Sequence, residues 1–133
     1  MPGPTIVRGF AAFDFAVTAL FALPWTADRL IGILFLLDAR LLGGAELPVT
    51  LSALTLTFAN IMGVLGVIWA LVRWTAPTLT HARMDAIGRA AVAAIILWHM
   101  QQDDLPRIFL VFVATELLGT LVQLALRPRH FPS

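Results

Sequence analysis

The sequence predicts an all-α integral membrane protein: a four-helix transmembrane bundle with a short outer-side helix between the first two spans. Composition is the first observation behind this prediction. Hydrophobic residues make up 59% of the 133 residues and charged residues 13%, whereas soluble domains average roughly 45–50% and 25%. The second observation is that the apolar residues fall into four long stretches, and a helix needs about 20 such residues to cross a bilayer. We therefore expect a single transmembrane domain over residues 1–133.

The first predicted span covers residues 6–23. Pro24 ends it beside Trp25, and tryptophan is suited to the headgroup level. Residues 27–42 follow, with a continuously apolar centre over residues 30–37 that charged side chains flank on both sides. As a helix, the apolar centre over residues 30–37 would be only about 12 Å long. It is therefore too short to cross a hydrocarbon core of about 30 Å. We expect this segment to be an amphipathic helix on the outer membrane surface, or a short re-entrant one.

The second predicted span covers residues 48–74, with Pro48 in a first turn where a missing backbone N–H does no harm. The third covers residues 84–100 and is close to the shortest length that crosses a bilayer. A polar turn separates it from the fourth span, residues 106–126, which Pro106 opens.

Arginine placement predicts the orientation, because cytoplasmic segments carry an excess of positive charge. Four crossings put the N-terminus, the loop after the second span and the C-terminus on one side. We expect that side to be the cytoplasm and the chain to lie in a bacterial inner membrane. The use of arginine without lysine is typical of GC-rich bacterial genomes. The arginines on this side are Arg8, Arg73, Arg83, Arg127 and Arg129.

Polar side chains within the apolar stretches predict a polar seam through the bundle. An ionisable group in hydrocarbon costs roughly 2.5–3.5 kcal/mol on insertion scales, so it is normally paired, solvated or functional. Spacings of three and four residues place these side chains on one stripe of each span. The seam consists of Asp14, Thr18, Asn60, Asp85, Arg89, Glu116 and Gln123.

Depth along the helices predicts which members of the seam meet. Asp14 and Arg89 lie at similar depths on different spans, so we expect them to form an interhelical ion pair. Asp85, one turn from Arg89 on the same helix, is the rival partner. Thr18 is one turn from Asp14, and its hydroxyl can donate to that carboxylate. Such an ion pair is more simply explained as structural than as functional.

Glu116 has the stronger claim to a function. It lies near the bilayer centre at nearly the level of Asn60, and no arginine matches its depth. We expect this carboxyl to be protonated, because desolvation disfavours the charged form, and to hydrogen-bond the Asn60 amide. A carboxyl in that state can bind a proton reversibly or hydrogen-bond a ligand.

Other residues carry weaker signals. Trp69 and His99 are possible ligand-facing residues, although packing for Trp69 and an interfacial hydrogen bond for His99 are the simpler explanations. With no cysteine and a single histidine within the spans, we expect no metal, no cofactor and no catalytic residues. Small residues at short intervals, such as Gly63 and Gly66, favour close helix packing.

Three classes of function fit these patterns. The leading one is a non-enzymatic membrane protein, either an accessory subunit or a small-ligand or lipid-binding bundle. The alternative is a proton-coupled small transporter that works as a homodimer, with Glu116 as its intramembrane carboxyl. The third, an enzyme acting on a lipid or isoprenoid, needs Asp14, Glu116 and His99 to converge from different depths. The expected partners are membrane lipids and a second copy or a larger membrane complex, because dispersed arginines do not make a nucleic-acid surface.

Overall fold

A computed structural model describes residues 2–44, 51–103 and 105–131. These ranges are helical and contain no β-strand, so the all-α prediction is confirmed. The elements are α1 (Gly3–Ala22), α2 (Pro24–Leu42), α3 (Ala53–Thr75), α4 (Leu79–Gln102), the 3-10 helix η1 (Arg107–Phe109), α5 (Leu110–Leu124) and the 3-10 helix η2 (Pro128–His130).

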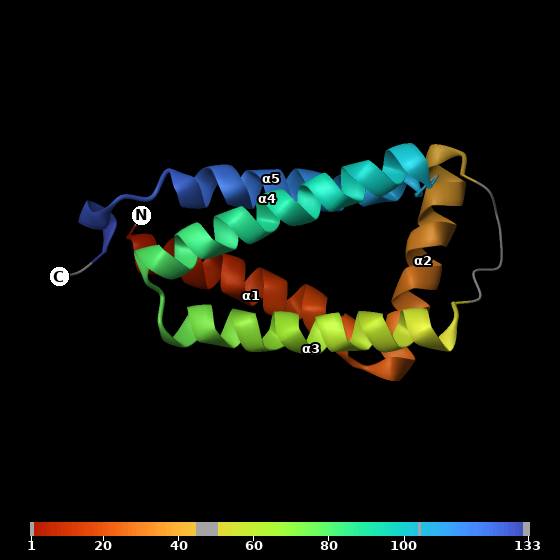
Figure 1. Cartoon of the computed structure of the whole chain (residues 1–133), viewed down its shortest axis with the longest axis horizontal. Coiled ribbons are helices and arrows are strands. Elements are labelled where there is room, and N and C mark those ends of the chain that lie inside the picture. Colours follow the sequence, from red (N-terminus) through yellow and green to blue (C-terminus); the bar gives the residue numbers. More distant parts are fainter. Residues whose placement is uncertain (1, 45–50, 104, 132–133) are drawn as a thin grey trace.

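Apart from α2, the long helices form two pairs, α1 with α3 and α4 with α5 (Figure 1). The pairs lie close together at the end that holds both termini and the α3–α4 turn, and they diverge toward the other end. There α2 lies crosswise and contacts α1, α3 and η1. The N-terminus, the α3–α4 turn and the C-terminus therefore share one end of the molecule.

Three helical segments are long and apolar enough to cross a membrane: Gly3–Ala22, Ala53–Thr75 and Arg107–Leu124. The helix α4 is longer than any of these, but charged side chains in its first half lower its apolar character. Large apolar side chains are exposed on several helices, among them Phe58 at 60% and Leu121 at 68%. Exposed apolar surface on this scale fits contact with hydrocarbon better than contact with water.

The crosswise helix α2 is longer than the predicted segment 27–42. The preceding helix α1 ends at Ala22, and Pro24 is the first residue of α2. Proline is well suited to this position, because its fixed φ matches the helix and the N–H it lacks would have no partner there. The same proline thus ends one helix and begins the next. At the far end of α2, Gly43 adopts a left-handed conformation with φ 73°.

A buried carboxylate attaches α2 to the α4–α5 pair. The Asp38 side chain is 6% exposed, and its Oδ1 accepts a hydrogen bond of 2.8 Å from the backbone N–H of Ile108 in η1. The first N–H groups of a helical segment have no partner within the helix, so this carboxylate caps the segment from a neighbouring helix. In the sequence, Asp38 is only one of the charges that flank the apolar centre of this helix, and its role as a cap for another helix was not predicted.

Side-chain caps also set the starts of α3 and α4. The Ser52 hydroxyl accepts from the N–H of Thr55 at 3.1 Å and begins α3; the predicted start at Pro48 lies outside the described residues. The helix α4 begins five residues before the predicted span 84–100, after Thr78. The predicted span 106–126 divides into η1 and α5.

A small cluster of buried apolar side chains lies at the end where the helix pairs meet. It joins the start of α1, the start of α4 and the chain after α5, so it holds the two pairs together at this end only. Three buried side chains form it and three partly buried ones pack against them, namely Val7, Ala82 and Leu126 with Ile6, Leu79 and Phe131.

Candidate functional site

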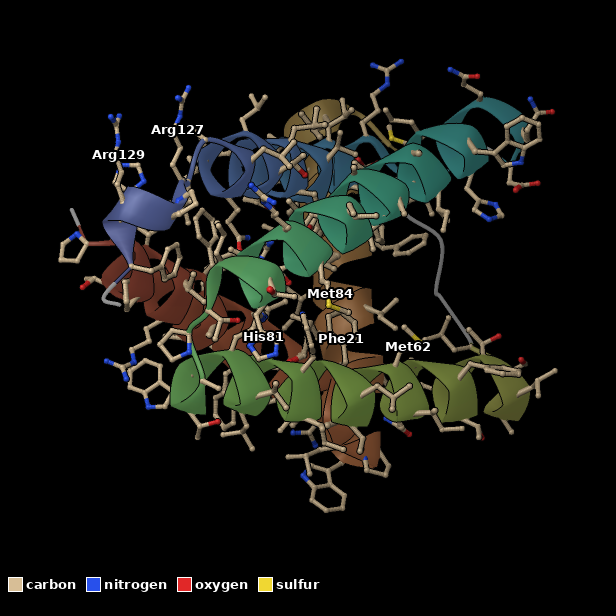
Figure 2. All side chains as sticks on the ribbon, turned by 60° about the vertical axis from the view of Figure 1, so that its left-hand side comes forward. Phe21, Met62, His81, Met84, Arg127 and Arg129 are labelled. Atoms are coloured by element: carbon tan, nitrogen blue, oxygen red, sulfur yellow. The ribbon has the colours of Figure 1, made fainter. Side chains whose placement is uncertain are left out.

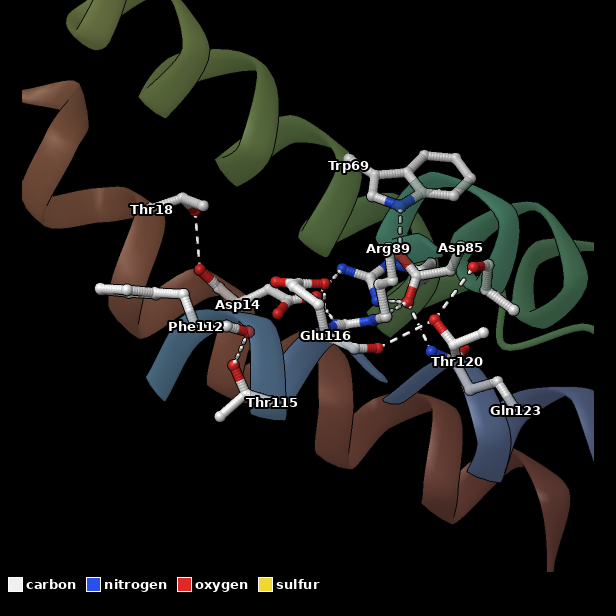
Figure 3. A network of polar contacts seen from close by, with 12 residues as sticks. Asp14, Thr18, Trp69, Asp85, Arg89, Phe112, Thr115, Glu116, Thr120 and Gln123 are labelled. Carbon is white, nitrogen blue, oxygen red and sulfur yellow. Dashed lines mark hydrogen bonds and ion pairs between the residues drawn. The ribbon is translucent and has the colours of Figure 1, made fainter. Parts of the chain in front are cut away.

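Five charged side chains from four helices meet between the two helix pairs; Figure 3 shows most of this network. The arginine side chains are 1% and 5% exposed, and the carboxylate side chains 6–19%. Charges buried this far from water are tolerated when they are paired. We call this group the ion-pair cluster; its members are Asp14 of α1, Arg73 of α3, Asp85 and Arg89 of α4, and Glu116 of α5.

Arg89 is the centre of the ion-pair cluster. Its Nε donates to Asp85 Oδ2 at 2.8 Å, its Nη1 donates to Glu116 Oε2 at 3.1 Å, and its Nη2 donates to Asp14 Oδ2. One planar guanidinium thus binds carboxylates on three helices, an arrangement for which arginine is better suited than lysine. Its side chain passes over Gly119, where an added Cβ would lie 2.7 Å from Arg89 Cδ.

Arg73 supplies the second guanidinium. Its Nη2 lies 2.6 Å from Asp14 Oδ2, and its Nη1 lies 2.7 Å from Asp85 Oδ2. The second contact lacks hydrogen-bond geometry, since Nη1 and Nε have no hydrogen-bond partner among the described residues. It still counts as an ion pair, because attraction between charges depends on their separation more than on alignment. The guanidinium also lies 5.5 Å from the centroid of the Trp69 ring.

Two neutral side chains hold the Asp85 carboxylate in place. The Trp69 indole N–H donates to Asp85 Oδ1 at 2.8 Å, and Gln123 Nε2 donates to Asp85 Oδ2 at 2.6 Å. Trp69 therefore faces the cluster. The Gln123 side chain is fully buried, and its Oε1 has no hydrogen-bond partner within the described segments.

The predicted pairing of Asp14 with Arg89 is confirmed. Asp85 also pairs with Arg89, so the two carboxylates are joint partners of one guanidinium and not rivals. The predicted hydrogen bond from Thr18 to the Asp14 carboxylate is wrong. The Thr18 hydroxyl donates to the backbone carbonyl of Asp14 at 2.7 Å, because the carbonyl one turn earlier is the nearest acceptor for a threonine within a helix.

We predicted that no arginine matches the depth of Glu116; the inference that it therefore has no arginine partner is also wrong. Comparing depths between Cα positions ignores the length of the Arg89 side chain, which extends past Gly119 to reach Glu116. Asn60 is not a partner of Glu116 either. Its Nδ2 donates to the backbone carbonyl of Phe21 at 2.8 Å, which lies in the last turn of α1 and has no partner within that helix.

The remaining candidate, His99, lies outside the ion-pair cluster. Its Nδ1 is paired with Asp103, the residue that follows α4, and both side chains are more than half exposed, at 53% and 61%. Asp14 and Glu116 both contact Arg89, so the structure brings together two of the three residues that the enzyme hypothesis requires. Within the described ranges, no group of three histidine, aspartate or glutamate side chains is placed to hold a metal ion.

Arg73 is the member of the cluster that sequence reasoning missed. It lies near the end of α3, and its position led us to assign it to the cytoplasmic flank. A signal was available: α1 and α3 are antiparallel neighbours, which brings the last turns of α3 alongside the middle of α1 and hence Arg73 near Asp14.

The cluster contains three carboxylates and two guanidinium groups. When all five are ionised, it carries a net charge of −1. Comparison with protein families, curated proteins and solved structures finds no match to this chain. Its function must therefore be argued from the ion-pair cluster and the helices that hold it.

Proposed function

We propose that this chain is a small non-enzymatic membrane protein that works as an accessory subunit or as a small-ligand or lipid-binding bundle. The observation that supports this proposal is the pattern of contacts in the ion-pair cluster. Each of its five charges contacts an opposite charge on another helix. Charges that are paired with one another fix the positions of four helices, but they are poorly placed to attack a substrate.

In this proposal α1, α3, α4 and α5 cross the inner membrane of a bacterium, and α2 lies on the outer surface. The charges of α4 can enter the bilayer because they are neutralised within the cluster. Both termini face the cytoplasm, since the end of the molecule that holds them is rich in arginine. Figure 2 shows Arg127 and Arg129 at this end, with their side chains directed away from the helices.

Reporter fusions test this topology. A fluorescent protein fused after Ser133 should be bright, because it folds in the cytoplasm, and alkaline phosphatase at the same position should be inactive. The same reporters inserted after Gly43, next to α2, should give the opposite pattern. Active phosphatase at the C-terminus would contradict four crossings with cytoplasmic ends.

Co-purification tests the accessory role. After mild solubilisation, the tagged chain should retain a membrane protein or a small molecule in a fixed stoichiometry. Arg89→Met should weaken this association, since the positions of the helices depend on the cluster, whereas Arg83→Met should not, because Arg83 is exposed outside it. A chain that purifies alone, carries no bound molecule and transports a solute would refute the accessory role.

A proton-coupled transporter that works as a homodimer is the second candidate. The excess of one carboxylate over the guanidinium groups favours it, because uptake of one proton makes the cluster neutral. Glu116 is the best placed to accept that proton. It contacts one arginine, whereas Asp14 and Asp85 contact two each, and its side chain is the most exposed of the three carboxylates at 19%.

Glu116→Gln tests the second candidate. Glutamine keeps an acceptor for Arg89 but cannot take up a proton, so the variant should fold and lose all coupled proton movement. The measurement is the collapse of an imposed pH gradient in proteoliposomes when small cationic or anionic solutes are added. Asp103→Asn, outside the cluster, should behave as wild type. Unchanged coupled flux in Glu116→Gln would rule out Glu116 as the proton carrier.

A further inference from the structure

The pair of helices α1 and α3 carries an apolar groove away from the ion-pair cluster. Its volume is about 290 Å³. Ala11 and Ala70 are each 1% exposed and form its floor, whereas the lining residues Phe15 and Trp74 are 43% and 50% exposed. The groove is lined by Ala11, Ala12, Phe15, Ala70, Leu71 and Trp74.

A single arginine lies at one end of this groove. Arg8 is one turn before Ala11 and Ala12 on the same face of α1, and its Nε donates to the backbone carbonyl of Trp74 at 3.1 Å. That carbonyl is in the last turn of α3, where carbonyls have no partner within the helix. The bond therefore holds the Arg8 side chain at the end of the groove.

The outer part of the Arg8 guanidinium is available to a ligand. The bond to Trp74 uses Nε alone, and neither terminal nitrogen makes a polar contact with another described residue. Arg8 is exposed. Two parallel N–H donors on one planar group match the geometry of two phosphate oxygens.

We propose that this groove binds an anionic phospholipid, with one acyl chain along the alanine floor and the phosphate on Arg8. The depth of the site fits, since tryptophan is favoured at the headgroup level, and Trp74 both lines the groove and accepts the hydrogen bond from Arg8. The sign of the charge fits as well, because the arginine-rich end of the molecule faces the leaflet that holds anionic lipids. The inference rests on the proposed orientation in the membrane but requires no role for the cluster.

A lipid chain fits this groove better than a helix from a second copy does. A helix with its side chains is about 10–12 Å across, which is wide for a groove of about 290 Å³ that has two aromatic side chains in its lining. A helix would also have to place an acidic group opposite Arg8. A phospholipid supplies both the narrow chain and the negative charge.

Native mass spectrometry of the full chain in mild detergent tests this site. Phosphatidylglycerol and phosphatidylcholine with identical acyl chains are added separately. One phosphatidylglycerol should be retained per chain in preference to phosphatidylcholine, and inorganic phosphate should not displace it. Arg8→Gln should weaken phosphatidylglycerol binding by roughly tenfold or more, because a hydrogen bond to a charged group contributes about 1.5–3 kcal/mol.

Two further variants make the test decisive. Ala12→Phe fills the groove from an exposed position and should block binding while Arg8 is intact, whereas Arg83→Gln, at an exposed arginine outside the groove, should change nothing. Equal losses in Arg8→Gln and Arg83→Gln, or equal retention of the two lipids, would overturn the proposal. A dimer that Ala12→Phe converts to a monomer would assign the groove to a second copy instead. The reporter fusions are independent of these outcomes, so a failed lipid site leaves the proposed topology standing.

Discussion

Arg89→Met should destabilise the protein by about 3–5 kcal/mol, the usual cost of removing one partner from a buried ion pair. The effect is large because one guanidinium contacts three carboxylates, on α1, α4 and α5. Arg73, which contacts Asp14 and Asp85 but not Glu116, would then be the one guanidinium left in the cluster for three carboxylates. Thermal and denaturant-induced unfolding in detergent measures the loss. Arg83→Met is the matched control, since this exposed arginine lies outside the cluster on the same helix, and its melting temperature should stay near that of wild type.

A second substitution shows which carboxylate depends most on Arg89. In the absence of Arg89, Asp14 keeps Arg73 at 2.6 Å and Asp85 keeps it at 2.7 Å. Glu116 has no other arginine among its described contacts. Adding Glu116→Gln to Arg89→Met should therefore recover more stability than adding Asp14→Leu. The sequence alone predicts the reverse, because it treats Asp14 and Arg89 as an isolated pair. If Asp14→Leu restores more stability, the contact between Arg89 and Glu116 is wrong.

The contrast between these two rescues shows what a sequence can predict about a buried cluster. Asp14, Asp85, Arg89 and Glu116 stand out because hydrocarbon disfavours charge, and this applies to each residue taken alone. Which of them meet depends on how the helices cross and how far each side chain extends. A long side chain beside a glycine can connect positions at different depths, as Arg89 does past Gly119. Depth along an idealised helix does not contain that information.

The crosswise helix α2 was predictable because its cause is local. A short apolar centre flanked by charges predicts a helix over residues 27–42 that is set apart from the spans, and the structure places a helix there that lies across the ends of the others. The role of Asp38 as a cap for η1 was not predictable from local sequence. A carboxylate next to an apolar segment has the same appearance in a sequence whether it meets water or caps a distant N–H, and Ile108 is 70 residues away.

Gly63→Ala should have the second large effect, by forcing α1 and α3 apart. A Cβ at position 63 would lie 2.2 Å from the backbone nitrogen of Ala22 and 2.5 Å from the carbonyl carbon of Phe21. These are backbone atoms, so they cannot turn aside as a flexible side chain does. The hydrogen bond from Asn60 to the Phe21 carbonyl lies at the same crossing. Overpacking typically costs about 1–3 kcal/mol, and a clash with backbone belongs at the upper end of that range.

The same substitution at two other glycines provides a comparison for the stability of Gly63→Ala. Gly9→Ala adds a methyl where no atom lies within 4 Å, so it should be neutral or stabilising by up to about 1 kcal/mol, the gain expected for alanine over glycine within a helix. At Gly66 the added Cβ would meet the Thr18 side chain at 2.5 Å. Rotation of the Thr18 side chain can move Cγ2 but not Cβ, which would lie 2.8 Å away. Gly66→Ala should therefore be destabilising, but less so than Gly63→Ala, whose contacts are with backbone atoms. Melting temperatures measured in one detergent should therefore follow the order Gly9→Ala, Gly66→Ala, Gly63→Ala, from highest to lowest. A Gly63→Ala variant as stable as Gly9→Ala would mean that α1 and α3 do not touch at this position.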